Sequence, residues 1–356
     1  MKNKIDSSDI SVVVQGQIVP KVTLLCLKNL RKYLSNAEII LSTWENSDVS
    51  NLGGLYDVLV FNKAQKAVIF DDVKNKYNNI NRILISSQSG LEHASRKYIL
   101  RIRSDLILKN DNLLYLFDDL SKRNFKSSLF KEKIFAYEKF SIKYDEKNEI
   151  KQRMLFHISD WCYLGLKEDL VELFNIPLVK EPDFSRYFET HAKSVNDIHK
   201  TRLWKMSPEQ YIISENAKKV FKNLNFENYL DITEENIQIS EDFIINNFRI
   251  FSEKEWGFSS YKKEYKNIKM FLRAPYVYYS KFEQLKDYKK YCDKNANIKD
   301  ENLFLYRIPY YEKLRKHFLQ IFFCPFCKKF SEMVSIFYYL LKFTFTFFKG
   351  RVCKKK

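Results

Sequence analysis

A chain of 356 residues that is 45% hydrophobic and 16% aromatic can bury a large core, which excludes disorder throughout. Its formal net charge of +17 is compatible with an anionic partner such as a nucleotide phosphate, a lipid headgroup surface or a nucleic acid. About half of this charge lies in the last 46 residues, which hold eleven Lys and Arg against two acidic residues, so the basic character is mainly a property of the C-terminal tail.

Cysteine usage and the N-terminus both predict a cytosolic protein. The six Cys are sparse and scattered, which is typical of reduced thiols and not of a disulfide framework. The N-terminal stretch reaches Asp6 and Asp9 before any apolar run begins, so it lacks the apolar region of a secretory signal. The close pair Cys324 and Cys327 has no second pair beside it, and we expect neither a zinc site nor a redox role there.

Strand and helix patterns alternate from the N-terminus onward. Runs of β-branched and apolar residues predict strands at residues 9–16, 37–44, 56–62 and 97–105. Apolar residues spaced three and four apart predict helices at residues 20–36 and 78–96. The order strand, helix, strand, strand, helix, strand is typical of an α/β fold with a mostly parallel sheet.

Polar residues follow several of these predicted strands. In parallel sheets the ligand lies at the carboxyl ends of the strands, where loops meet helix N-termini. The residues that we expect there are Gln15, Gly16, Thr43, Glu45, Arg103, Ser104 and Asp105. An acid in this position could hold a divalent cation on a diphosphate, because Mg²⁺ and Mn²⁺ prefer carboxylate oxygens. Asp105 could equally cap a turn, Gly16 could serve only a tight turn, and Glu45 could be a surface charge.

A second informative stretch, "HISDWCYLGLKEDLVELF", covers residues 157–174 and reads as a strand followed by a helix. Asp160 precedes an aromatic strand with Trp161 and Tyr163, where a carboxylate could take the proton of an acceptor hydroxyl while an aromatic ring stacks on the sugar. The alternative is a solvated acid at a strand edge. His157 lies close in sequence and could contribute to an acceptor or metal site.

The short run "SPEQY", residues 207–211, has the composition of a helix start. Ser207 is a good N-cap, Pro208 suits the first turn, and Glu209 is favoured by the helix dipole. Helix capping alone explains why these residues occur here. The alternative hypothesis is that Glu209 has a functional role.

The tail from about residue 312 to residue 356 is both aromatic and basic. Pro325 and several Lys interrupt its apolar runs, so none reaches the ~18 to 20 residues of a membrane-spanning helix. Phe and Tyr could instead enter the headgroup boundary while Lys and Arg meet anionic lipids, which predicts a peripheral membrane tail. A helical hairpin packed on the preceding domain is the alternative.

The runs "DISVVVQGQIVP", "YLSNAEIILSTWENSDVS", "YDVLVFNK", "NNINR" and "KYILRIRSDLIL" together resemble the WavE-type lipopolysaccharide synthesis family. More distantly, they resemble the nucleotide-sugar domain of GT-A glycosyltransferases. The resemblance implies a GT-A-like, Rossmann-type domain over residues 1–270, followed by a helical C-terminal extension over residues 271–356.

In the enzymes that the chain resembles, a helix with an Asn-Arg pair precedes a strand that ends in an Asp-x-Asp motif. Asn81 and Arg82 match the pair, and Arg103-Ser104-Asp105 matches the acidic motif with Arg in place of the first Asp. The resemblance implies that these residues bind the donor and that Asp105 binds Mn²⁺ or Mg²⁺. The substitution at Arg103 leaves open a mechanism with little metal, in which Arg103 or Arg82 neutralises the diphosphate.

The resemblance therefore implies a glycosyltransferase, with Asp160 and Glu209 as candidate catalytic residues. It would transfer a sugar from a nucleotide-sugar donor to a lipid-linked saccharide, a lipopolysaccharide core or another surface polysaccharide. The reaction would take place at the inner face of the cytoplasmic membrane. The alternative is a non-catalytic, degenerate transferase that binds membrane surfaces or nucleic acid. No nucleic-acid reader motif occurs, so we do not expect a nucleic-acid partner.

Overall fold

The computed structural model describes residues 4–144, 154–193, 200–260 and 279–296. Met1–Tyr261 and Val277–Asn297 belong to one compact unit. The expected domain boundary at residue 270, the Cys pair and the expected membrane tail all lie outside the described residues, so they stay predictions. Within the described ranges, no helix combines the length and the apolar character needed to cross a bilayer.

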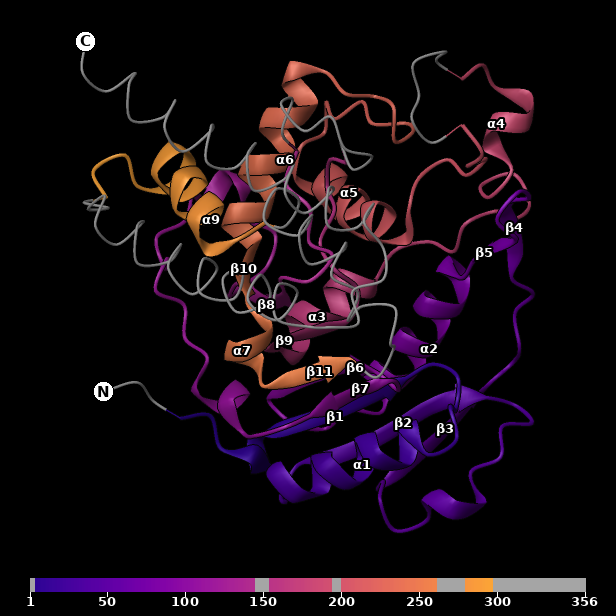
Figure 1. The fold of residues 1–356 in the computed structure, drawn as a ribbon. Coiled ribbons are helices and arrows are strands. Elements are labelled where there is room, and N and C mark those ends of the chain that lie inside the picture. The colour runs from indigo at the N-terminus through magenta and orange to yellow at the C-terminus, as the bar shows by residue number, and fades with distance from the viewer. Residues whose placement is uncertain (1–3, 145–153, 194–199, 261–278, 297–356) are drawn as a thin grey trace, which may run out of the picture. The chain divides into compact units, whose positions relative to one another are not determined.

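A seven-stranded sheet with the order β10-β8-β9-β6-β1-β2-β3 forms the centre of the described part (Figure 1). Its strands are β1 (Ile10–Gln15), β2 (Glu38–Trp44), β3 (Val58–Asn62), β6 (Tyr98–Arg103), β8 (Ile134–Tyr137), β9 (Cys162–Leu166) and β10 (Phe248–Phe251). Neighbouring strands are parallel except where β9 pairs with β6 and with β8. Two antiparallel pairs stand apart from this sheet: β4 (Val68–Asp71) with β5 (Lys76–Asn78), and β7 (Leu106–Leu108) with β11 (Phe258–Ser260).

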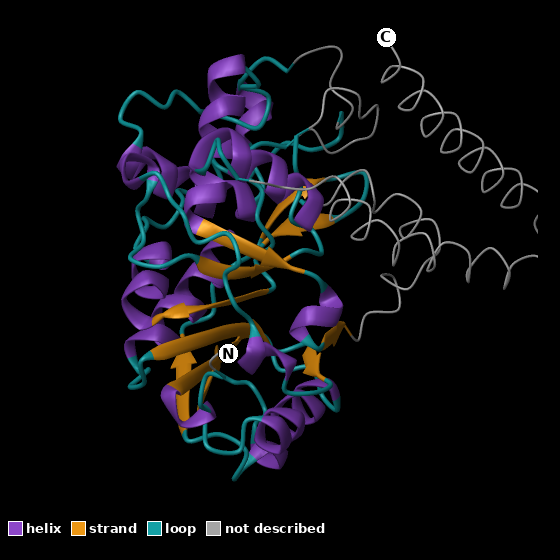
Figure 2. Cartoon of the chain, turned by 90° about the vertical axis from the view of Figure 1, so that its left-hand side faces the viewer, coloured by secondary structure: helices purple, strands orange, loops and turns teal. Residues whose placement is uncertain are grey.

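Helices pack on both faces of this sheet. They are α1 (Val22–Tyr33), α2 (Ile80–Glu92), α3 (Lys167–Phe174), α4 (Tyr187–Thr190), α5 (Pro208–Val220), α6 (Glu234–Asn247), α7 (Glu253–Trp256) and α9 (Lys281–Asp287). Short helical turns cover η1 (Ser7–Asp9), η2 (Ser50–Leu52), η3 (Asn112–Tyr115), η4 (Phe125–Ser127) and η7 (Tyr288–Cys292). Figure 1 shows α1 on one side of the sheet and α2 and α3 on the other, and Figure 2 shows the layers from the side.

The expected α/β fold with a mostly parallel sheet is confirmed. The predicted strands and helices of the first 105 residues correspond to β1, α1, β2, β3, α2 and β6. The second stretch forms β9 and α3 as expected, and α5 begins at Pro208 with a capping box between Ser207 and Gln210. The β4–β5 hairpin was not predicted, because its strands are very short and a register shift interrupts their pairing.

The sheet changes its winding direction at β1. The chain first adds β2 and β3 on one side of β1 and then returns through α2 to add β6 on the other side. A crevice forms outside the carboxyl ends of the strands at such a switch point, and it is where ligands bind in open α/β sheets. The end of β1, at Gln15 and Gly16, is therefore the place where the fold itself favours a ligand.

Gly90 allows α2 to pack closely on the sheet. A Cβ at this position would lie 2.4 Å from Val13 Cγ1 and 3.2 Å from Ser42 Cβ. We expect Gly90→Ala to lower the free energy of unfolding by about 1–3 kcal/mol, because overpacking outweighs the gain of up to ~1 kcal/mol in helix propensity. Urea denaturation against Ser89→Ala on the same helix measures this. A Gly90→Ala variant more stable than the wild type would contradict the close packing.

Candidate functional site

Hydrogen bonds from Ser104, the residue after β6, connect the carboxyl ends of β1 and β6. The Ser104 N–H donates to the Gln15 carbonyl at 3.0 Å, and the Ser104 hydroxyl donates to the Gln17 carbonyl at 2.6 Å. Gly16 has a φ of 113°, a backbone conformation that favours glycine. Because glycine has no side chain, a ligand can approach the backbone closely at this turn. Three of the expected donor-binding residues, Gln15, Gly16 and Ser104, thus come together at the switch point.

Arg103 and Asp105 form a bidentate ion pair beside this turn. The Arg103 Nε and Nη2 donate to the two carboxylate oxygens of Asp105 at 2.9 and 2.8 Å. The guanidinium also lies over the ring of Trp161, with 5.0 Å between its Cζ and the ring centroid. The Asp105 side chain is only 14% exposed. The acid expected to bind a metal is therefore already engaged at both oxygens by the residue that replaces the first Asp of the motif.

The expected metal at Asp105 stays a prediction. Over residues 4–144, 154–193, 200–260 and 279–296, no three His, Cys, Asp or Glu side chains converge in a way that could hold a metal ion. Asp105 would contribute one carboxylate, and a cation would have to compete for it with a charge-assisted pair.

The residues expected at the end of β2 differ in their exposure to solvent. Thr43 is fully buried, and its hydroxyl lies 3.2 Å from that of Ser47. Trp44 is buried under Arg82, whose Cζ lies 4.9 Å from the ring centroid, whereas Glu45 is exposed. The Arg82 Nε is buried and has no hydrogen-bond partner among the described residues. Such an unsatisfied donor is costly unless something binds it, so Arg82 is a candidate for contact with an anionic ligand.

Asn81 has a structural partner. Its amide accepts from the Val179 N–H at 2.8 Å and donates to the Val179 carbonyl at 2.9 Å. Its side chain therefore ties the start of α2 to the segment that follows α3. Any contact of Asn81 with a donor would compete with these two hydrogen bonds.

The two candidate catalytic carboxyls share one buried cluster. Asp160 lies just before β9, and Glu209 lies in the first turn of α5. His157 lies between α5 and the residues that follow β8. Its Nε2 is 3.7 Å from Glu209 Oε2, and its Nδ1 is 2.9 Å from the Phe140 carbonyl oxygen. Asp160 is 4% exposed, whereas the Glu209 side chain keeps 19% of its surface accessible. Glu209 is therefore the carboxyl of this pair that a substrate reaches more easily.

The electrostatics of this cluster favour neutral groups. Burial raises the pKa of Asp160, and the charge of Glu209 raises it further. Burial also raises the pKa of Glu209, while Arg103 acts against this shift in both carboxyls. Burial lowers the pKa of His157 to about 4, so its imidazole is neutral at pH 7. A carboxyl whose pKa is raised toward neutrality is suited to proton transfer.

Arg101 was not anticipated from the sequence. It is fully buried on β6, where its Nη1 donates to the Asp160 carbonyl and its Nε donates to Ser87 at 3.1 Å. Ile99, Arg101 and Arg103 alternate along β6 and share one face of the sheet. This spacing could have shown that two arginines face the same layer, although it could not have shown which of them is buried.

Known proteins resemble this chain to different degrees. The sequence matches the family described as WavE lipopolysaccharide synthesis over residues 10–319. No curated protein sequence gives a significant match.

Two solved structures resemble the fold. One is 4-diphosphocytidyl-2C-methyl-D-erythritol synthase from Anaerococcus prevotii, with 13% identity, a TM-score of 0.31, and coverage of 66% of this chain and 97% of that chain. The other is HddC from Yersinia pseudotuberculosis, with 10% identity, a TM-score of 0.27, and coverage of 46% of this chain and 79% of that chain. With TM-scores this low, neither structure supports a particular residue or reaction.

Proposed function

The chain belongs to the WavE lipopolysaccharide synthesis family, which it matches over residues 10–319, and on this premise we propose that it is a glycosyltransferase that uses a nucleotide-sugar donor. One observation supports this reading above the others. Two carboxyls with raised pKa values lie in one cluster with Arg103, which pairs with Gln15 across the switch point of the sheet. Anion-binding groups and a proton acceptor are the two elements that such a transfer requires.

The donor diphosphate would lie at the turn after β1 and β6. The backbone of Gly16 allows close approach, and two cationic groups flank it: Arg103 at the end of β6, and Arg82 of α2, which lies over Trp44 at the end of β2. Arg82 would satisfy its unpartnered Nε on the diphosphate. Fixed cations that neutralise the charge developing on a leaving diphosphate stabilise the transition state without further reorganisation.

Glu209 is the proposed general base. In the transfer, an acceptor hydroxyl oxygen forms a bond to the anomeric carbon of the donor sugar while the bond from that carbon to the diphosphate breaks. The hydroxyl proton passes to the Glu209 carboxylate, and the electron pair of the broken bond leaves with the nucleoside diphosphate. Asp160, which is more deeply buried, is a positioning residue in the same cluster, and the charge of Glu209 raises its pKa.

The acceptor and the cellular location are part of the same proposal. A lipid-linked saccharide, such as a growing lipopolysaccharide core, fits the family's role in lipopolysaccharide synthesis. The reaction would take place at the cytoplasmic face of the membrane, with the basic tail on anionic lipids.

Asp105→Asn tests the donor site. The change keeps the shape of the side chain but removes the charge that orients the Arg103 guanidinium through two hydrogen bonds. We expect sugar transfer to fall by about 10²-fold or more with little change in folding. Incorporation of radiolabelled sugar from a nucleotide-sugar panel into lipid-linked saccharide extracts measures this.

Asp111→Asn is the matched control, since Asp111 also forms an ion pair with a basic residue, Lys4, but is not among the residues assigned to the donor site. Equal transfer by Asp105→Asn and the wild type would refute the assignment. If the wild type transfers no sugar and no nucleotide sugar raises its melting temperature, the proposed function itself is wrong.

A further inference from the structure

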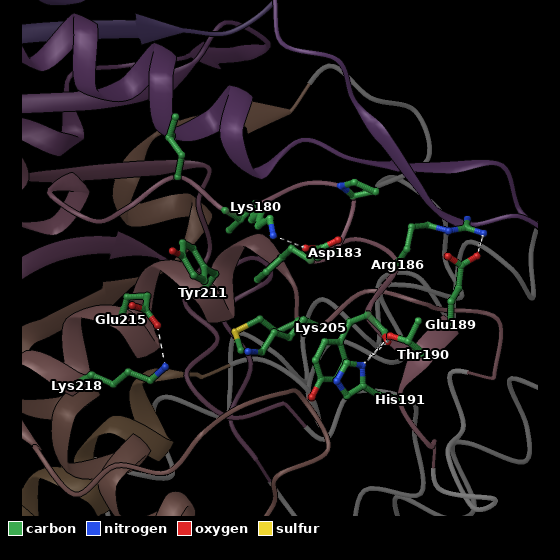
Figure 3. A pocket seen from close by; sticks show the side chains of 16 residues that line it. Lys180, Asp183, Arg186, Glu189, Thr190, His191, Lys205, Tyr211, Glu215 and Lys218 are labelled. Atoms are coloured by element: carbon green, nitrogen blue, oxygen red, sulfur yellow. Dashed lines mark hydrogen bonds and ion pairs between the residues drawn. The ribbon is translucent and has the colours of Figure 1, made fainter.

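A pocket of about 570 Å³ lies beside the proposed site, within the size range of small-ligand pockets of ~300–1,000 Å³ (Figure 3). Its walls come from the segment 178–184, from α4 and the residues beside it, from residues 205 and 206, and from one face of α5. The proposed reaction gives this pocket no role.

The charged side chains around the pocket are paired. Figure 3 shows Lys180 beside Asp183, Lys218 beside Glu215 and Arg186 beside Glu189. The Nζ–Oδ2 distance in the first pair is 3.3 Å, and the Nζ–Oε1 distance in the second is 2.8 Å.

The remaining cation of the pocket, Lys205, and the already paired Arg186 each have a carboxylate partner that does not line the pocket. Lys205 reaches Glu227 at 2.8 Å, and Arg186 also binds Asp72 at 2.8 Å. Positive and negative groups therefore nearly balance, so the pocket has little net field to attract an anion. Instead it offers donors and acceptors side by side, which suits hydroxyl groups that both donate and accept.

Aromatic rings add apolar faces to these polar groups. Tyr187 and His191 stack with their ring centroids 3.9 Å apart and their planes 9° apart. Tyr211 lies in the opposite part of the view in Figure 3 and packs edge-on against Phe184 at 5.3 Å. Flat apolar surfaces combined with paired donors and acceptors complement a sugar ring, whose carbon-bound hydrogens pack on aromatic faces while its hydroxyls form hydrogen bonds.

Two elements connect the pocket to the proposed transfer site. The helix α5 carries Tyr211, Glu215 and Lys218 in the pocket wall and Glu209 at its first turn. Val179, which also lines the pocket, is bound through its backbone to Asn81 at the start of α2. A ligand in this pocket would thus lie one helix away from the proposed base.

We propose that this pocket binds the uncharged saccharide portion of the acceptor, which rests on the proposed function. The recognised chemistry is a neutral oligosaccharide of a few rings, held by the Tyr187–His191 stack and the paired charges. Phosphate groups of the acceptor would lie outside the pocket.

The test uses the full chain and the core oligosaccharide released from lipopolysaccharide by mild acid, with and without phosphatase treatment. Binding is measured by calorimetry, and hydrogen exchange locates it. We expect both preparations to bind with similar affinity and to protect residues 178–191 and 205–218. Tyr187→Ala should weaken this binding by about tenfold or more, and a nucleoside diphosphate should bind as before.

Tyr115→Ala is the control, because Tyr115 is exposed and also has a lysine over its ring, with Lys4 Nζ at 5.1 Å compared with 5.3 Å for Lys205 over Tyr187. His191→Ala, at an exposed position, repeats the test if Tyr187→Ala does not fold.

Three outcomes overturn the inference: no oligosaccharide binding, binding that requires the phosphates, or protection outside the pocket. Each of these can occur while the nucleoside diphosphate still binds and transfer continues. If the wild type does not bind the nucleoside diphosphate, that result would instead count against the proposed function.

Discussion

Glu209→Gln is expected to reduce sugar transfer by about 10² to 10⁴-fold, the usual contribution of a general base, without loss of stability. Gln keeps the shape of the side chain but cannot accept the hydroxyl proton. Initial rates with the wild type and the variant at saturating donor measure the effect. Glu234→Gln is the matched control, because Glu234 lies in the first turn of α6 as Glu209 does in α5 but is exposed.

The stability of the same variant has a predictable sign. Burial raises the pKa of Glu209 in the folded protein above its ordinary value. The contribution of this shift to the free energy of unfolding is fully present below the pKa of Glu209 in the unfolded chain, near 4.5. It is lost as the pH rises through the higher pKa of Glu209 in the folded protein. At pH 7 the carboxyl is therefore a cost that Gln removes, and we expect an equal or higher melting temperature. A fully active Glu209→Gln would show that Glu209 serves only the helix dipole.

Asp160→Asn should change the pH dependence of transfer. The charge of Glu209 raises the pKa of Asp160. Repulsion between two carboxylates is mutual, so we expect Glu209 to ionise more easily once the Asp160 charge is removed. The base then becomes available at lower pH, and the acid limb of the pH–rate profile is expected to move to lower pH. An unchanged profile would mean that Asp160 does not act through Glu209.

Much of the fold was predictable because its strands are continuous apolar runs. A buried parallel strand such as β1 needs apolar side chains on both faces, and that leaves a clear signal in the sequence. Once β1 and β6 are recognised as neighbours, the polar residues at their carboxyl ends must meet. Gln15, Gly16 and Ser104 do so because sheet geometry requires it.

The remaining contacts depend on tertiary packing that no local pattern encodes. The sequence separates Asp160 from Glu209, and only the position of β9 beside β6 and of α5 behind it brings them together. Asn81 matched a motif, but its amide was already bound to Val179, 98 residues away. The pocket around Tyr187 has no motif at all, since its walls come from separate segments.

Replacing Arg103 is expected to have the second large effect. Arg103→Met removes the guanidinium that we assign to the leaving diphosphate and leaves the largely buried Asp105 carboxylate without this ion pair. Transfer should fall by about 10² to 10³-fold, as when one oriented donor to developing charge is lost. Arg103→Lys should recover part of the rate, because a lysine keeps the charge but not the bidentate geometry. Arg96→Met, at the exposed other end of β6, is the control.

Arg103→Asp separates the guanidinium mechanism from a metal mechanism. This change restores two acids at the end of β6, and carboxylate pairs shared with a diphosphate suit Mn²⁺ or Mg²⁺. We expect the wild type to keep its rate in chelator, because its donor set favours the guanidinium, and Arg103→Asp to be active only with added Mn²⁺. If chelator abolishes wild-type transfer, Mn²⁺ restores it, and Arg103→Met remains active, then a metal on Asp105 carries the diphosphate charge and the role assigned to Arg103 is wrong.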